Sequence, residues 1–116
     1  MRLLRLKKNE DFSEVIRTGK SYVSHLIVLY VKKVDDASPC RVGFSVGKKV
    51  GSAVRRNYYK RVLREIVRLH APRIRPGFDC VVIARPAIQK ATFAEVEHHL
   101  LTLFARARVL AKEDER

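Results

Sequence analysis

The chain has 116 residues, of which 47% are hydrophobic, so it has room for one compact domain with a single core, and extended disorder is not expected. Its 25 Lys and Arg outnumber its 12 Asp and Glu and give a formal net charge of +13, far above what solubility requires. This excess favours a polyanionic partner, nucleic acid before an anionic membrane surface. The sequence has no Trp, and no predicted helix pairs a basic face with a large exposed apolar one, which argues against a membrane partner.

The cysteines and the N-terminus indicate the compartment. Cys40 and Cys80 lack CxxC spacing and have no His at ligand distance, so they predict neither a zinc site nor a redox motif. The N-terminus is basic but lacks the apolar core of a signal peptide, and no stretch is long enough to cross a membrane. We therefore expect a reduced, cytoplasmic protein with a single domain over residues 1–116, of which 110–116 form a frayed tail.

The first predicted element is a short helix. Asn9 is a plausible N-cap, and acidic residues follow it in the first turn. Gly19 suits the C′ position that ends a helix. Phe12, Val15 and Ile16 fall at steps of three and four and form its buried stripe.

Two strands are expected next. Residues 21–34 are rich in β-branched and aromatic side chains, which are typical of strands. The segment is expected to break near Ser24 and His25 because small and polar residues interrupt the run there. A turn follows over residues 35–39.

The segment from residue 40 to residue 47 alternates strictly and predicts a further strand. Its core face carries Cys40, Val42, Phe44 and Val46. Its other face carries Arg41, Gly43, Ser45 and Gly47. This second face is a smooth strip bracketed by Arg41 and Lys49, and glycine in a strand often marks close approach by another backbone or a ligand. A bulge or a bend is the alternative explanation.

Residues 52–70 read as one amphipathic helix with a basic outer face. The outer stripe spans an arc of roughly 100° and contains Asn57, Lys60, Arg61, Arg64 and Arg68, joined by Ala53. The apolar stripe contains Tyr59, Val62, Leu63, Ile66, Leu69 and the His70 ring. Glu65 is the one acid in the segment, so pairing along the helix is not expected to neutralise this charge.

A basic face can simply keep a surface helix soluble. Here, however, the Arg and Lys residues lie in register with Asn57, and the helix is entered through a Gly-Lys-Lys-Val-Gly turn at residues 47–51. Arg donates two parallel hydrogen bonds to phosphate, and Asn can read a base edge or a 2′-hydroxyl. This combination favours RNA binding.

The last part of the chain predicts a central strand and a final helix. Pro72 and the turn at 75–77 precede the apolar run Phe-Asp-Cys-Val-Val-Ile-Ala-Arg, which Pro86 ends. Thr92 and Glu95 form a capping box. The apolar side of the helix contains Phe93, Val96, Leu100, Leu103, Phe104 and Ala107. Adjacent His98 and His99 lack metal-ligand spacing and are expected to be solvated.

The predicted order of elements is α-β-β-β-α-β-α, with two or three strands before the basic helix. This order favours an α/β two-layer sandwich of the α+β kind, in which one sheet is covered by helices.

Several stretches resemble the bacterial ribonuclease P protein family. RVGFSVGKKVGSAVRRNYYKRVLRE resembles its signature segment, RLKKNEDFSEVIRTG its opening helix, LIVLYVKK the following strand and DCVVIARP its last strand. The likeness covers most of the chain in the right order. It implies a left-handed βαβ crossover like that of one domain of a ribosomal protein, which no periodicity can show.

The resemblance also implies two binding surfaces. The first would contact RNase P RNA through Arg56, Asn57, Lys60, Arg61 and Arg64, and we add Lys48, Lys49 and Arg68 from the charge pattern. The second, a cleft for the single-stranded 5′ leader of precursor tRNA, would use Phe12, Ile16 and Tyr30, with Arg41, Gly43 and Ser45 as its floor.

Two positions depart from the family pattern. Tyr58 stands where Arg often follows the Asn, so one RNA contact is expected to be lost or made by stacking or a hydroxyl. Ile16 replaces the second cleft aromatic, and a base can press against Ile but cannot stack on it.

The resemblance implies a non-catalytic subunit whose partners are RNase P RNA and precursor tRNA, with no membrane and no obligate protein partner. Mg²⁺ is expected to be held mainly by the RNA and the substrate, because the sequence has no clustered carboxylates for a two-metal site. One alternative is a general RNA-binding protein of ribosomal type that uses the same helix. Another is a protein-only nuclease with His25 or His70 as the general base.

Overall fold

The computed structural model describes residues 4–111 as one sheet with three helices. The strands and helices are β1 (Leu4–Arg5), α1 (Asn9–Thr18), β2 (Lys20–Val23), β3 (Ile27–Lys33), β4 (Arg41–Val46), α2 (Ala53–Leu69), β5 (Phe78–Ala84) and α3 (Phe93–Arg106). Short 3₁₀ turns connect them at η1 (Lys48–Val50), η2 (Ala71–Arg73) and η3 (Pro86–Lys90).

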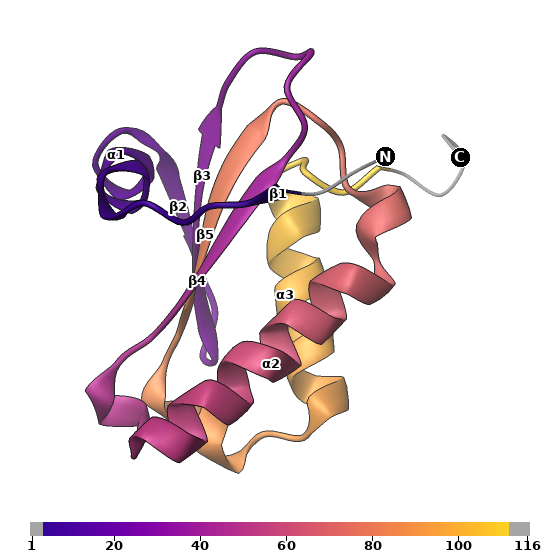
Figure 1. Ribbon diagram of the computed structural model, residues 1–116. Helices are drawn as coiled ribbons and strands as arrows, with labels where there is room; N and C mark the ends of the chain where they lie inside the picture. Colours follow the sequence, from indigo (N-terminus) through magenta and orange to yellow (C-terminus); the bar gives the residue numbers. More distant parts are fainter. Residues whose placement is uncertain (1–3, 112–116) are drawn as a thin grey trace.

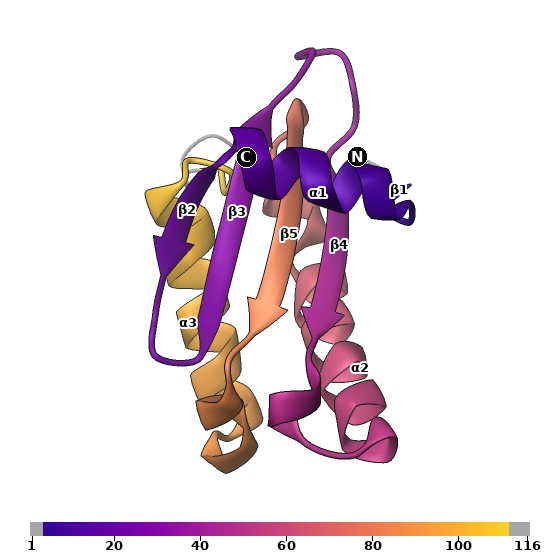
Figure 2. The same cartoon turned by 90° about the vertical axis from the view of Figure 1, so that its left-hand side faces the viewer.

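The strand order across the sheet is β1-β4-β5-β3-β2. β4 runs parallel to β1 and β5, whereas β3 runs antiparallel to β2 and β5. α2 and α3 cover one face of the sheet, and α1 crosses the other face near one end (Figures 1 and 2). The β4–α2–β5 crossover is left-handed, as Figure 2 shows, against the usual right-handed preference. The expected α+β class is thereby confirmed.

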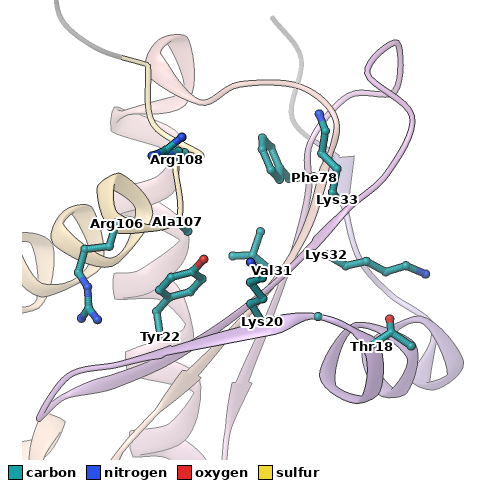
Figure 3. Close-up of a pocket in the computed structure, with 11 residues that line it drawn as sticks. Thr18, Lys20, Tyr22, Val31, Lys32, Lys33, Phe78, Arg106, Ala107 and Arg108 are labelled. Atoms are coloured by element: carbon teal, nitrogen blue, oxygen red, sulfur yellow. The ribbon is translucent and has the colours of Figure 1, made fainter.

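The main core lies between the sheet and the α2/α3 layer. Its fully buried side chains include Leu63, Ile66, Leu100, Leu103 and Phe104. A smaller cluster under α1 joins Leu6, Val15 and Val81 to the half-buried Phe12, Tyr30 and Ile83. At the end of α3, a hollow of about 690 Å³ opens between this helix and the β2/β3 end of the sheet (Figure 3).

Two local expectations are confirmed with their physical cause. The chain turns between β2 and β3 at Ser24, whose Oγ accepts hydrogen bonds from the backbone N–H of Leu26 (3.2 Å) and Ile27 (3.1 Å). At the start of α3, Thr92 Oγ1 accepts from Glu95 N at 3.1 Å, and Glu95 Oε1 accepts from Thr92 N at 2.8 Å, which completes the capping box.

The ends of α1 differ from the expectation. The N-cap is Lys8, which makes no side-chain cap, and Asn9 is already helical. Gly19 ends the helix with extended backbone at φ −84°, a conformation that any residue can adopt. Glycine is required at this position because of the space around it. A Cβ at Gly19 would lie 2.6 Å from the carbonyl oxygen of Val15 and 2.7 Å from that of Val31, too close for any other residue. Glycine is needed here so that the helix can turn directly into β2.

Three further details correct the expected pattern. β1 is an additional strand, too short to show alternation, and pairs with the start of β4. On α2, Leu69 is 48% exposed and Val67 is buried in its place, because Leu69 lies about 110° from the centre of the buried stripe at 100° per residue. Phe93, in the first turn of α3, is 42% exposed rather than buried.

The expected tail is also shorter. Leu110 is buried and forms an isolated bridge with Ile74, and the N–H of Ala111 donates to Arg73 O at 2.7 Å. Residues 112–116 of the expected tail lie outside the described residues.

Within residues 4–111, none of the helices is both long and apolar enough to cross a bilayer.

Candidate nucleic-acid interface

The first candidate surface is the outer side of α2. Ser52 caps the helix, since its Oγ accepts from the N–H of Arg55 at 3.4 Å, and burial of Leu63 and Ile66 fixes which side faces the sheet. We call the predicted set of side chains on this helix the α2 basic face, and all of them except Arg56 project outward: Arg56, Asn57, Lys60, Arg61, Arg64 and Arg68. Among residues 4–111, no acid pairs with Lys60, Arg61 or Arg64, so these charges are available to a partner.

Arg56 and Arg68 stand apart from the other four. Arg56 lies toward the buried side of the helix, and its Nε is buried with no hydrogen-bond partner in the described chain. Arg68 is held by Glu65 through two hydrogen bonds, Nε to Oε1 at 2.8 Å and Nη2 to Oε2 at 2.7 Å. This pair lowers the pKa of Glu65. The expectation that pairing along the helix leaves the charge untouched is therefore wrong for Arg68, because a spacing of three residues suits the pair.

A groove of about 510 Å³ runs between α2 and the β1/β4 edge of the sheet. Its walls include Arg61, Arg64 and Arg68, and its apolar floor includes Val42 and Phe44. β1, which sequence patterns missed, supplies the far rim with Leu4 and Arg5. Alternation placed Phe44 in the core, whereas the structure leaves its ring half-buried beside arginines, where a base could contact it.

The turn before α2 adds two exposed lysines. Lys48 and Lys49 form the first part of η1, and the turn is closed by Gly51 with φ 147°, a conformation that favours glycine. The Lys49 carbonyl accepts from Gln89 Nε2 at 3.5 Å, which joins η1 to η3. Both lysines therefore precede the α2 basic face along the chain and extend its positive charge toward the N-terminus of the helix.

The second candidate surface lies on the opposite side of the sheet, beside α1. The strand register places Tyr30, Val81 and Gly43 in one row, and Val28, Ile83 and Ser45 in the next. α1 contacts β3 and β5 and covers the first row through Phe12 and Val15. The second row is only half-buried, and Ile16 of α1 is 40% exposed. We call this surface the open sheet face and define it by Phe12, Ile16, Val28, Tyr30, Ser45 and Ile83.

Gly43 was expected in the exposed floor of the leader-binding cleft, but in the structure it has a different role. A Cβ on Gly43 would lie 2.5 Å from Cζ of Phe12, so the ring of the protein's own α1 occupies this part of the smooth strip. Gly43 is consequently buried beneath Phe12. The alternation correctly indicated a close approach, but the neighbour is an aromatic side chain from another element.

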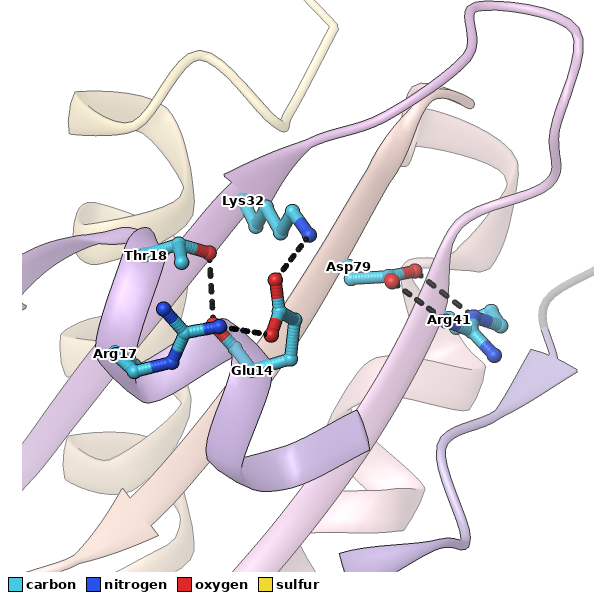
Figure 4. Close-up of polar contacts among 6 residues, drawn as sticks. All are labelled: Glu14, Arg17, Thr18, Lys32, Arg41 and Asp79. Carbon is cyan, nitrogen blue, oxygen red and sulfur yellow. Dashed lines mark hydrogen bonds and ion pairs between the residues drawn. The ribbon is translucent and has the colours of Figure 1, made fainter. Parts of the chain in front are cut away.

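Arg41 is likewise engaged within the protein. Its Nε and Nη2 donate to Asp79 Oδ1 and Oδ2 at 2.9 and 2.6 Å (Figure 4). Its Nη1 lies 3.6 Å from Asp11 Oδ2 of α1. The hydrogen bonds to Asp79 raise the pKa of Arg41. Asp79 is buried, so the paired Arg41 is what allows a carboxylate there. Arg41 thus links α1 to β4 and β5 and positions the open sheet face.

A second polar contact holds α1 at its middle, one turn after Asp11. Glu14 Oε1 lies 3.2 Å from Lys32 Nζ on β3, and Glu14 also pairs with Arg17 (Figure 4). These two contacts, the Lys32 hydrogen bond first, lower the pKa of Glu14. Since two ion pairs and the packing of Phe12 and Val15 hold α1 on the sheet, the fold sets the distance between Ile16 and the half-buried sheet row.

The histidines are tied into local contacts. His70 Nε2 lies 2.8 Å from Glu97 Oε2, and His99 Nδ1 lies 2.9 Å from Ser24 Oγ, so His99 is not simply solvated as expected. His25 and His98 are exposed. Cys40 and Cys80 are free and buried, and the hydrogen bond with Cys40, together with burial, raises the pKa of the Cys80 thiol. In the part of the chain that the structure describes, no group of three or more His, Cys, Asp or Glu lies close enough to hold a metal.

Comparisons with known proteins agree over nearly the whole chain. A family model described as Ribonuclease P matches residues 1–108. The chain is 44% identical over 109 residues to the ribonuclease P protein component of Symbiobacterium thermophilum, covering 94% of this chain and 95% of that protein.

Two solved structures share both fold and sequence with this chain. The RNase P protein of Staphylococcus aureus superposes with a TM-score of 0.85 at 33% identity, covering 94% of this chain and 99% of the other. The RNase P protein of Thermotoga maritima gives a TM-score of 0.80 at 36% identity, covering 88% and 96%.

Proposed function

This chain belongs to the ribonuclease P protein family, whose members are components of a tRNA-processing ribonuclease, and on that premise we propose how its two surfaces act. The α2 basic face binds the RNase P RNA. The open sheet face holds the single-stranded 5′ leader of precursor tRNA. The subunit thereby assists the endonucleolytic removal of the leader that gives the mature 5′ end.

The α2 basic face is the observation that carries this proposal. Lys60, Arg61 and Arg64 project from one rigid helix, and among residues 4–111 none of them has an acidic partner. A folded RNA presents phosphates at fixed spacing, so cations on a rigid helix can meet several of them without the cost of ordering a flexible backbone. The adjoining groove adds the Phe44 ring, against which an unpaired base can stack.

The open sheet face suits a different ligand. It is almost free of unpaired charge, since Arg41 and Lys32 are both paired with carboxylates. It offers instead the half-buried rings of Phe12 and Tyr30 and the small, half-buried side chain of Ser45. An extended single strand can lay its bases on such a surface, because every base has an apolar face.

We assign the bond-breaking chemistry to the RNA. When bound, Mg²⁺ would stabilise charge on the phosphoryl oxygens and generate a hydroxide nucleophile. The side chains described here do not fit a metal site, so we expect that ion to be held mainly by RNA and substrate. The part of this chain is to bind and orient, which is sufficient to raise the rate when the reacting groups are already present.

Cleavage assays with and without the RNA test this assignment. Purified chain, precursor tRNA and Mg²⁺ should give no specific cleavage, whereas addition of the cognate RNase P RNA at low Mg²⁺ should give the mature 5′ end. Specific cleavage by the chain alone would contradict the proposal and favour a protein nuclease. In that case His25→Ala and His70→Ala would identify the general base. We also propose action in the cytoplasm, without an obligate protein partner.

A further inference from the structure

The hollow at the end of α3 has no role in the function proposed above. We call it the α3 pocket. It lies at the β3/β2 side of the sheet, whereas the α2 groove lies at the β4/β1 edge. Its lining combines two aromatic rings with charged residues that are all basic: Lys20, Lys32, Lys33, Arg106 and Arg108.

Three of these five cations are available to a ligand. Lys32 lies 3.2 Å from Glu14, and Lys33 pairs with Asp36. Over the described range 4–111, Lys20, Arg106 and Arg108 have no acidic partner, and all three are exposed. They come from two elements that are distant in sequence, the start of β2 and the end of α3, so the fold gathers them around one hollow (Figure 3).

The two rings make the pocket more than a cationic surface. Arg106 Cζ lies 5.9 Å from the centroid of the half-buried Tyr22 ring, and Lys33 Nζ lies 4.8 Å from the centroid of Phe78. Figure 3 shows the Tyr22 ring between the side of α3 and the floor residue Val31. Solubility requires only the charges. A ring flanked by cations is the arrangement that receives a base and its adjoining phosphate together.

The backbone of Arg108 provides a second, independent observation. It follows α3 with φ 61°, and it is the only residue other than glycine in residues 4–111 with a positive φ. The turn is closed by hydrogen bonds from Arg108 N to Ala105 O at 3.1 Å and from Val109 N to Phe104 O at 2.9 Å. Glycine is favoured at such a position because L side chains are crowded there. The chain instead places a guanidinium at the pocket, a choice that backbone stability does not explain.

We propose that the α3 pocket is a second RNA-binding site that takes one nucleotide unit of a single strand. Lys20, Arg106 and Arg108 contact the phosphates, and the base lies against Tyr22. Because the pocket and the α2 groove lie on different parts of the sheet, one chain can hold two RNA segments at once. This site does not depend on the assignment of either surface in the proposed function.

The test measures the affinity of the full chain for a short fluorescein-labelled oligouridylate by anisotropy over a range of salt concentrations. The double variant Arg106→Gln, Arg108→Gly should bind several-fold more weakly, with the log-log salt slope reduced by about 1.4 for two contacts on a single strand. Arg108→Gly alone should weaken binding while its melting temperature stays equal or rises, since glycine relieves the crowded backbone. Tyr22→Phe should bind as the wild type does, and Tyr22→Leu should bind more weakly.

The control removes the same charge elsewhere. Lys7→Gln, Lys8→Gln changes two exposed lysines outside the pocket and should leave the salt slope nearly unchanged. Equal losses in the two double variants would overturn the proposal, because they would show a general effect of net charge. So would unchanged binding in the pocket variant, or no binding of the oligouridylate by the wild type at low salt. Competition by inorganic phosphate with no effect of Tyr22→Leu would also overturn it, by showing a simple anion site. The affinity of the double variant Arg61→Gln, Arg64→Gln for RNase P RNA tests the proposed function separately.

Discussion

The α2 basic face and the open sheet face present opposite chemistry on opposite sides of one sheet. On α2, Arg61 and Arg64 have no acidic partner within the described chain, and charge dominates the surface. Beside α1, Arg41 and Lys32 form ion pairs with Asp79 and Glu14, and the rest of the surface consists of half-buried rings and small side chains. The total charge of +13 is therefore a poor guide to function. What matters is which cations the fold neutralises internally and which it leaves to a partner.

The largest expected effect comes from removing the free charges of α2. Arg61→Gln with Arg64→Gln should weaken binding of RNase P RNA roughly 100-fold or more at low salt, because charge-assisted hydrogen bonds to phosphate are lost. The log-log salt slope should fall by about 1.8 for two phosphate contacts. Filter binding across a salt series measures both.

Arg68→Gln is the matched control on the same helix. Arg68 is already held by Glu65 through two hydrogen bonds, so its replacement should change the affinity much less than Arg64→Gln alone. Equal effects of Arg64→Gln and Arg68→Gln would mean that the internal ion pair does not distinguish the two arginines. This result would contradict the claim that cations paired within the protein contribute less to RNA binding.

The next effect concerns the packing of the open sheet face. Gly43→Ala places a methyl group 2.5 Å from Phe12 Cζ and should lower the free energy of unfolding by about 1–3 kcal/mol. It should also reduce the preference of the holoenzyme for leader-bearing tRNA, since the Phe12 ring must move. Urea unfolding and substrate binding measure the two consequences.

Gly47→Ala provides the control, four residues after Gly43 and directly after the end of β4. No atom lies within 4 Å of a Cβ at Gly47, and its φ of −80° suits any residue. The substitution should therefore leave stability unchanged or raise it by about 0.4–1 kcal/mol through the unfolded state. A loss at Gly47 equal to that at Gly43 would refute the steric explanation.

The sites of these variants differ in how well sequence patterns predict them. The 3.6-residue period identified α2 and its outward side, and alternation identified β4, because both patterns are local. The pairing of Arg41 with Asp79 depends on the parallel register of β4 and β5, which no local pattern contains. Alternation likewise predicted a close approach at Gly43 but not that Phe12 makes it, since α1 lies far away in sequence.

Boundaries and short elements were the least predictable parts. β1 has only 2 residues, too few to show a period, yet it forms one rim of the α2 groove. The left-handed crossover was expected only from the family resemblance, because general chain geometry favours the other hand. Arg108 at positive φ had no sequence signal, since glycine is the residue that marks such a position.

A smaller effect should follow from restoring an aromatic ring. Ile16 is 40% exposed at the edge of the open sheet face, so Ile16→Phe can add a stacking surface without entering the core. The variant should bind leader-bearing tRNA at least about fivefold more tightly in the holoenzyme, because base stacking on aromatic rings contributes about 1–3 kcal/mol per base. Ile16→Leu, which adds no ring, should bind as the wild type does.

The smallest effect is expected at Glu65. Its pKa is lowered by Arg68, so the pair contributes stability above the unfolded value of 4.5, and that contribution is lost as the pH falls through the lower folded value. Glu65→Gln should remove this pH dependence and free Arg68, which should tighten RNase P RNA binding up to about threefold at neutral pH. Titration of RNA affinity at fixed salt measures the change, and weaker binding would contradict it.

The central claim is that the open sheet face binds the leader while α2 binds the RNase P RNA. The most direct test is the ratio of affinities of the reconstituted holoenzyme for precursor and mature tRNA, measured for the wild type and for Phe12→Leu. We predict that the wild type prefers precursor tRNA and that Phe12→Leu reduces this preference severalfold. The affinity between the protein and RNase P RNA should be unchanged. Equal binding of the two tRNAs by the wild type would contradict it and favour a general RNA-binding protein of ribosomal type.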